Sequence, residues 1–259
     1  MTDNDAAAMS PSTGWRKPLL VVALVLPTLI TWLYFVALAA TPPSIQQSAY
    51  SLGKGLQFLL PVIWWLGLMY VWKRNLAAGD GIGRLTPAAR LGRGVPLGIG
   101  FGLVLLAAIW LLYSYLLKPM GLFDGPAIEV REKIRGMGLG SLPAYVALGV
   151  FYSLFHSLLE EWYWRWFVFG ELCRGMSLPI AITVSSLGFA AHHVLVLATF
   201  FGWQSPATYF FSLCVAVGGA FWAWLYHRSG SLLGPWLSHM LVDAALFVIG
   251  FDLAGDLLN

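Results

Sequence analysis

The chain has 259 residues, of which 59% are hydrophobic and 10% are charged, and its formal net charge is +3. Soluble domains are typically about 25% charged, and even a large one leaves roughly a quarter of its unfolded surface in water. The composition therefore excludes an ordinary soluble domain and predicts an integral membrane protein surrounded by the lipid bilayer. The weak net charge and the lack of a basic run argue against a nucleic-acid partner.

The chain begins with a polar segment, and an apolar run follows it. Residues 1–15 are small and polar, which predicts a disordered tail, and Arg16 and Lys17 precede an apolar run over about 18–40. This run is longer than the ~7–15 apolar residues of a signal peptide, so we expect a retained helix rather than a cleaved leader. Residues 16–259 are expected to form a single transmembrane domain.

Six further apolar segments follow, and each is close to the ~20 residues that a helix needs to cross a bilayer. They lie at about 56–72, 95–117, 142–169, 178–200, 206–226 and 231–250. The predicted fold class is all-α, a polytopic transmembrane helix bundle with about seven, or eight, spans.

The basic residues indicate how the chain is oriented, because Lys and Arg accumulate in cytoplasmic loops. Basic residues flank the first span, separate the second from the third, and follow the fourth and sixth: Arg16, Lys17, five within 73–93, Arg174 and Arg228. Placing all of these in the cytoplasm puts the N-terminal tail inside and the C-terminus outside. The absence of an organelle-targeting segment favours a bacterial inner (plasma) membrane.

One basic segment does not fit this orientation. Residues 118–140 carry Lys118, Arg131, Lys133 and Arg135, yet seven spans place them outside. We expect an amphipathic helix on the membrane surface there, or a span count that differs by one. The first three spans contain almost no ionisable residue, and Lys54 is the only charge between the first and second. The chemistry is therefore expected after residue 150.

The fourth apolar segment contains the run Glu160-Glu161-x-x-x-Arg165. A charge inside a bilayer costs several kcal/mol, so such residues are functional candidates. Glu161 and Arg165 share one helix face and can neutralise each other, whereas Glu160 points about 100° away and is left without that partner. His156 lies one turn before Glu160, and unpaired burial would suit Glu160 to proton transfer near neutral pH. The alternative is an interfacial helix end whose charged side chains reach into water.

The fifth and seventh segments carry histidines. Phe189 and His193 are one turn apart, among small residues that allow a neighbouring helix to approach closely. Because His192 and His193 point in different directions, we expect only one of them to face a site. His239 and Asp243 share a face, so Asp243 can hold the His239 ring in one tautomer. The alternatives are histidines that only hydrogen-bond neighbouring helices, and an isolated structural pair.

A shared polar cavity explains the three groups together, because burying so many polar side chains separately would be costly. In such a cavity a glutamate base can activate a water beside a histidine. His239 and Asp243 can then stabilise the oxyanion that forms on the substrate.

The three groups, in this order, resemble the CPBP family of glutamic intramembrane endopeptidases, which includes the type II CAAX prenyl endopeptidases and the bacterial Abi proteins. The family pattern is EExxxR, then FxxxH, then HxxxN or HxxxD. This chain matches it with Glu160-Glu161-x-x-x-Arg165, Phe189-x-x-x-His193 and His239-x-x-x-Asp243. The resemblance covers about 150–250, and we expect a catalytic core within about 142–250.

The resemblance implies a role for each matched residue. Glu160 would be the general base, acting with His193 on a water, and His239 with Asp243 would bind the oxyanion. Glu161, Arg165 and Phe189 would be supporting residues, and no metal or other cofactor is implied. Many members have Asn at the position of Asp243, and Asn can donate a hydrogen bond that an ionised Asp cannot. Asp243 is therefore either protonated or used to orient His239.

Two other interpretations stay open. Glu160, His193, His239 and Asp243 are all zinc-ligand types, so a zinc-dependent membrane protease is one alternative, although the HExxH motif is absent. The other is a non-catalytic membrane protein, such as a scaffold, an immunity protein or a transporter component. The leading prediction is an endopeptidase acting on a membrane-associated protein or peptide. Its substrate could be a prenylated protein, a bacteriocin-like exported peptide or a membrane-anchored sorting signal.

Overall fold

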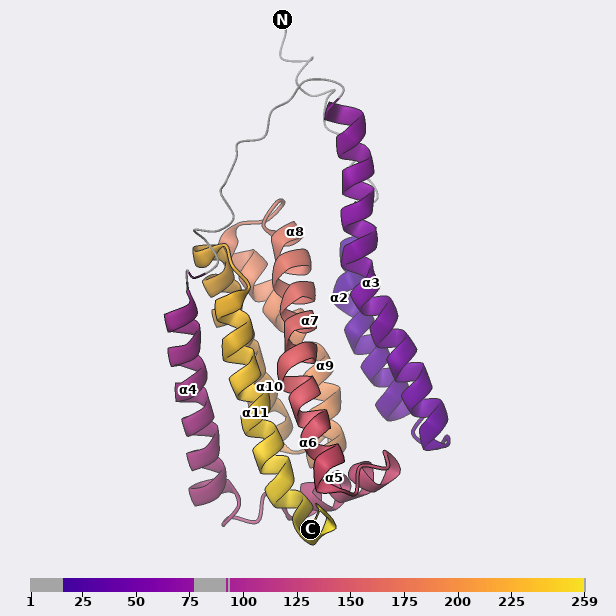
Figure 1. Ribbon diagram of the computed structural model, residues 1–259, viewed down its shortest axis with the longest axis vertical. Helices are drawn as coiled ribbons and strands as arrows, with labels where there is room; N and C mark the ends of the chain where they lie inside the picture. The colour runs from indigo at the N-terminus through magenta and orange to yellow at the C-terminus, as the bar shows by residue number, and fades with distance from the viewer. Residues whose placement is uncertain (1–15, 77–91, 93, 259) are drawn as a thin grey trace, which may run out of the picture.

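The computed structural model describes residues 16–76, 92 and 94–258. The predicted disordered tail at 1–15 and the basic residues Arg84, Arg90 and Arg93 lie outside the described residues. All regular structure in the described part of the chain is helical, without a strand (Figure 1). The predicted all-α class is therefore confirmed.

The helices follow the predicted apolar segments closely. In chain order they are α2 (Arg16–Trp32), which continues as the π-helical η2 (Leu33–Ala37), α3 (Pro43–Leu76), α4 (Val95–Leu112), which continues as the π-helical η3 (Tyr113–Leu117), and α5 (Asp124–Gly136). A single long rod follows, made of α6 (Leu142–Phe151), η4 (Tyr152–His156), α7 (Ser157–Glu161), η5 (Trp162–Phe169) and α8 (Gly170–Leu172). The chain ends with α9 (Leu178–Phe201), α10 (Pro206–Ser229), α11 (Leu233–Ala254) and the short η6 (Gly255–Leu258).

Six helical stretches in the described residues are long and apolar enough to cross a membrane, so the chain is an integral membrane protein. They are 17–37, 95–117, 142–172, 178–201, 206–229 and 233–254. The predicted second span, 56–72, lies inside α3, which begins at Pro43 rather than near residue 56. Hydropathy marks only the apolar part of a helix, which explains the difference. The count of about seven spans stays a prediction.

Proline and glycine mark the ends of several helices. A proline occupies the first turn of α4, α6, α9 and α10, where its missing N–H costs no hydrogen bond. Gly230 ends α10 at a φ of 66°, in the left-handed region that favours glycine. The chain then turns directly into α11, which carries two of the predicted site residues.

Helix α11 lies between α4 and the α6–α8 rod, while α2 and α3 form a pair to one side (Figure 1). Its close approach to α4 depends on glycines. A Cβ atom added at Gly98 would lie 2.2 Å from the Gly234 carbonyl oxygen, and one added at Gly102 would lie 2.9 Å from Cα of Ser238. Small residues at a helix crossing allow this close packing, which brings α11 into the centre of the bundle.

The apolar surface and the core fit a bilayer environment. Large apolar side chains point outward from several helices, including Leu52 and Ile63 on α3 and Val104 on α4. The buried core is rich in aromatic side chains from η5 and α9, such as Trp164, Phe167 and Phe189. This aromatic core surrounds the polar residues of α7.

The basic segment 118–140 contains α5 and is held against the end of α11. The ammonium group of Lys118 lies 2.5 Å from a carboxylate oxygen of Asp252, and Arg131 Nε donates to the Leu253 carbonyl at 3.0 Å. Lys133 Nζ lies 5.0 Å from the centre of the Tyr34 ring. Burial lowers the pKa of Lys133, and Glu129 opposes this shift. The predicted helix is present, and its position relative to the membrane surface stays a prediction.

Candidate active site

Glu160 and Glu161 lie on α7, a five-residue α-helical stretch between the π-helical segments η4 and η5. Each π-helical turn adds a residue to the usual turn and re-aims the side chains that follow, and such turns are frequent at functional sites. Glu160 is 3% exposed and Glu161 is fully buried. The two carboxylates therefore point into the bundle and do not reach out from an interfacial helix end.

Glu161 and Arg165 form the predicted i,i+4 pair, with Arg165 Nε 3.2 Å from a Glu161 oxygen. The guanidinium carbon of Arg165 lies 4.6 Å from the centre of the Phe189 ring and 5.1 Å from that of Trp222. Arg165 Nη2 also donates to the Gly219 carbonyl at 3.4 Å. Breaking such a buried pair by removing one partner typically costs about 3–5 kcal/mol, so this pair positions α7, α9 and α10 against one another.

His239 is oriented mainly by Glu161. The distance from His239 Nδ1 to a Glu161 carboxylate oxygen is 2.8 Å, whereas His239 Nε2 lies 3.6 Å from Asp243 Oδ1. A carboxylate accepts hydrogen bonds, so Nδ1 of His239 donates to Glu161. The ring also stacks on Trp222, with centres 4.4 Å apart. Asp243 was expected to hold this ring, but Glu161 makes the shorter contact because α11 packs against α7.

Glu160 lies among nitrogen atoms from four elements. Its Oε1 is 3.4 Å from Lys54 Nζ, 3.7 Å from His156 Nε2 and 3.7 Å from His192 Nε2. Its Oε2 is 4.0 Å from His239 Nε2. The expectation that Glu160 lacks an ion-pair partner is wrong, because α3 supplies Lys54.

Lys54 is the residue that the sequence analysis missed. It is 8% exposed and lies within α3 rather than in a loop between spans. The expectation that the chemistry is concentrated after residue 150 leaves out this contact between Lys54 and Glu160. A lysine in a helix that continues into an apolar segment is a candidate for a charge inside the membrane. The sequence did not reveal this for Lys54, because the helix was predicted to begin near residue 56 and not at Pro43.

His192 and His193 both reach Glu160. Glu160, His192 and His193 each offer an atom within 4.8 Å of the other two, and the two ring centres are 4.2 Å apart. The expectation that only one of them faces the site is wrong, because a ring nitrogen of each lies within 4.8 Å of a Glu160 oxygen. His193 Nδ1 lies 2.9 Å from the Phe189 carbonyl oxygen, so Nδ1 donates and Nε2 keeps a lone pair.

Several other buried polar atoms near these residues make no hydrogen bond within the described structure. They include His156 Nε2, His192 Nδ1 and Ser186 Oγ. Buried polar groups in native proteins nearly always have a partner, either protein or water. His156 and His192 both approach Glu160 at 3.7 Å, which supports the predicted polar cavity.

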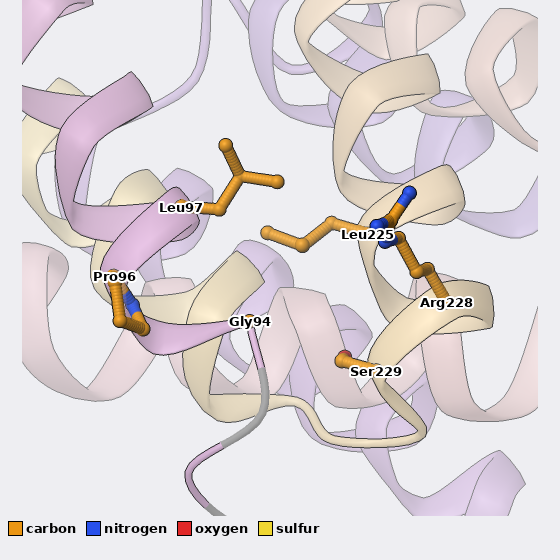
Figure 2. Close-up of a pocket in the computed structure, with 6 residues that line it drawn as sticks. All are labelled: Gly94, Pro96, Leu97, Leu225, Arg228 and Ser229. Carbon is orange, nitrogen blue, oxygen red and sulfur yellow. The ribbon is translucent and has the colours of Figure 1, made fainter.

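An apolar groove lies beside α11, and none of the predicted site residues lines it. It has a volume of about 600 Å³ and runs between α6, η4 and α11, with Ser153, Leu154 and Met240 among its lining residues. A separate cavity of about 360 Å³ lies where α4 begins and α10 ends (Figure 2). None of the predicted site residues lines that cavity, so the candidate site is the polar cluster itself.

The fold and the polar cluster define a class, a polytopic membrane protein with a buried acid–histidine site. Residues 142–245 match the family model described as Type II CAAX prenyl endopeptidase Rce1-like. This match contains all three motifs and confirms the predicted resemblance of this segment to the CAAX-type protease family. No curated protein and no solved structure matches the chain.

Proposed function

We propose that this protein is a glutamic-type intramembrane endopeptidase that hydrolyses a peptide bond of a membrane-associated protein or peptide. One observation carries the proposal: Glu160, His193 and His239, from three separate helices, meet in one buried cluster. The proposed catalytic core comprises about 142–250, and α3 contributes Lys54 from outside it.

The proposed reaction begins with a water between Glu160 and His193. Glu160 removes a proton from this water as general base, while the lone pair of His193 Nε2 accepts a hydrogen bond from it. The resulting hydroxide forms a bond to the carbonyl carbon of the substrate peptide. The carbonyl electron pair moves onto oxygen and gives a tetrahedral oxyanion.

His239 is proposed to stabilise that oxyanion from Nε2. Its Nδ1 donates to Glu161 at 2.8 Å, and in the proposed step Nε2 also carries a proton, which it can donate to the oxyanion. Asp243, 3.6 Å from Nε2, either keeps this nitrogen protonated or, when protonated itself, donates a second hydrogen bond. When the intermediate breaks down, Glu160 returns its proton to the leaving amine.

The direct test compares the protein termini in membranes from cells that produce the wild-type chain or the Glu160→Gln variant at equal levels. A neutral glutamine cannot act as a base, so we expect a defined set of new termini to disappear in the variant. Glu132→Gln, an exposed position on α5, is the matched control and should keep the wild-type set. Identical termini in wild type and Glu160→Gln would favour a non-catalytic role.

A zinc-dependent protease is the second candidate, supported by the mutual proximity of Glu160, His192 and His193. The ammonium group of Lys54, 3.4 Å from Glu160, argues against it, because a cation at that distance opposes binding of a second cation. We expect purified protein to contain no stoichiometric zinc and its cleavage activity to survive chelation. Stoichiometric zinc that is lost together with activity would establish the metal-dependent mechanism instead.

A further inference from the structure

Lys54 is a buried charged residue on α3, next to leucines that point outward from the same helix. Leu52, Leu56 and Leu59 on the same helix are each more than half exposed, whereas Lys54 is 8% exposed. The Lys54 ammonium lies 5.7 Å from the ring centres of both Tyr50 and Phe58. The aromatic rings and the carboxylate of Glu160 thus replace its water shell.

Such a buried lysine is not explained by stability. A buried ion pair is often no more stable than apolar residues of the same volume, because both charges lose their hydration. An unbranched methionine would fill the same space against Tyr50 and Phe58. The presence of a charge here therefore points to a role at the carboxylate that it contacts.

Lys54 is the only lysine or arginine within 4.0 Å of Glu160 in the described residues. The other buried cation, Arg165, is paired with Glu161 at 3.2 Å. The other ionisable groups that interact with Glu160 come from α3, η4, α9 and α11: Tyr50, Tyr152, His156, His192, His193, His239 and Asp243. The histidines carry a charge only when they are protonated, so they cannot guarantee an ionised Glu160.

We propose that Lys54 is a positioning residue for Glu160, holding its carboxylate ionised and fixing its Oε1 atom on the α3 side of the site. The other oxygen, Oε2, then faces His239 at 4.0 Å, where the substrate carbonyl would be bound. This inference rests on the proposed role of Glu160 as the base. Helix α3 thus adds a cation to a site whose three motifs all lie in 142–245.

The test is spectroscopic and needs no substrate. Purified full-length protein in lipid nanodiscs, with its glutamate carboxyl groups labelled with ¹³C, is titrated by infrared difference spectroscopy. The Glu160 band is assigned by its loss in Glu160→Gln. In Lys54→Met we expect Glu160 to take up its proton at a pH about one to three pH units higher than in wild type, because an opposite charge within ~4–6 Å favours the ionised form.

Three further variants complete the design. Lys54→Arg keeps the charge and should restore the wild-type titration, and Lys54→Gln replaces Lys54→Met if the latter fails to fold. Lys118→Met removes a different lysine–carboxylate pair, with Asp252, and should leave the Glu160 band unchanged. A Glu160 titration in Lys54→Met or Lys54→Gln that coincides with wild type would overturn the proposal.

Cleavage measurements on the same variants distinguish failure of this proposal from failure of the proposed function. If both hold, Lys54→Met loses about tenfold or more of its cleavage rate at neutral pH and recovers as the pH rises. If the infrared band shifts while no termini depend on Glu160, Lys54 has the inferred effect but the protein is not the proposed protease. If termini depend on Glu160 but the band does not shift, the protease stands and the role of Lys54 is refuted.

Discussion

At the scale of single residues, the site consists of two carboxylates with different surroundings. Glu161 is fixed on both sides, by Arg165 at 3.2 Å and by His239 at 2.8 Å. Glu160 is surrounded at longer distances, between 3.4 and 4.0 Å. A tightly held carboxylate suits a positioning role, and a loosely held one has room to accept a proton from a bound water.

Substitutions of Asp243 can distinguish hydrogen-bond donation from an effect of its negative charge. Because Glu161 already orients His239, Asp243→Asn should leave the ring in place and still supply a hydrogen-bond donor. We expect Asp243→Asn to keep Glu160-dependent cleavage within about tenfold of wild type, and Asp243→Leu to lose about a hundredfold, as on removal of one oxyanion donor. The measurement is the yield of Glu160-dependent termini at equal protein levels. Equal losses in both variants would show that Asp243 acts through its negative charge.

At the scale of helices, the α4–α11 crossing places His239. Helix α4 contains none of the site residues, yet its glycines allow α11 to approach, and α11 carries His239 and Asp243. A methyl group at Gly98 would overlap the Gly234 backbone, whereas one at Gly100 would meet nothing within 4 Å. The site therefore depends on an element outside the family match at 142–245.

This crossing leads to a stability prediction. Gly98→Ala should lower the free energy of unfolding by about 1–3 kcal/mol through overpacking and should reduce cleavage. Gly100→Ala adds the same methyl group on an open face and should leave both unchanged. The first effect is measured by heating the protein in detergent and recording the loss of its monodisperse peak in size-exclusion chromatography. Equal midpoints for Gly98→Ala and the wild-type chain would contradict the close approach of α4 and α11.

At the scale of the whole molecule, the orientation in the membrane follows from the number of spans. Six spans are evident in the described residues, and α3 would be the seventh. The basic groups of Lys118 and Arg131, which oppose the proposed orientation, are bound to the end of α11. These contacts reduce their weight as orientation signals, so we propose a bacterial inner membrane with the N-terminus in the cytoplasm and the C-terminus outside.

Cysteine labelling tests this orientation. The chain has only two cysteines, Cys173 and Cys214, and replacing both with serine gives a background without thiols. A cysteine added at the N-terminus should react with a membrane-impermeant maleimide only after the membrane is opened. One added at the C-terminus should react in intact spheroplasts. Both termini reacting from the same side would require an even number of spans.

The amino-acid sequence by itself determined the apolar segments that form long helices and indicated most of the candidate site residues. Apolar runs have the length that a bilayer demands, so the segment predicted at 178–200 becomes a helix at 178–201. Intramembrane charges are rare because they are costly, so the Glu160 and His239 motifs were visible without a structure. Both signals are local, and each depends only on neighbouring residues.

Only the tertiary structure decided which side chains meet. Lys54 and Glu160 are 106 positions apart, and Glu161 and His239 are 78 apart. Such contacts depend on where helices cross and on how the π-helical turns around α7 rotate its carboxylates. Neither property produces a repeating pattern in the sequence, because both result from packing between helices that are distant along the chain.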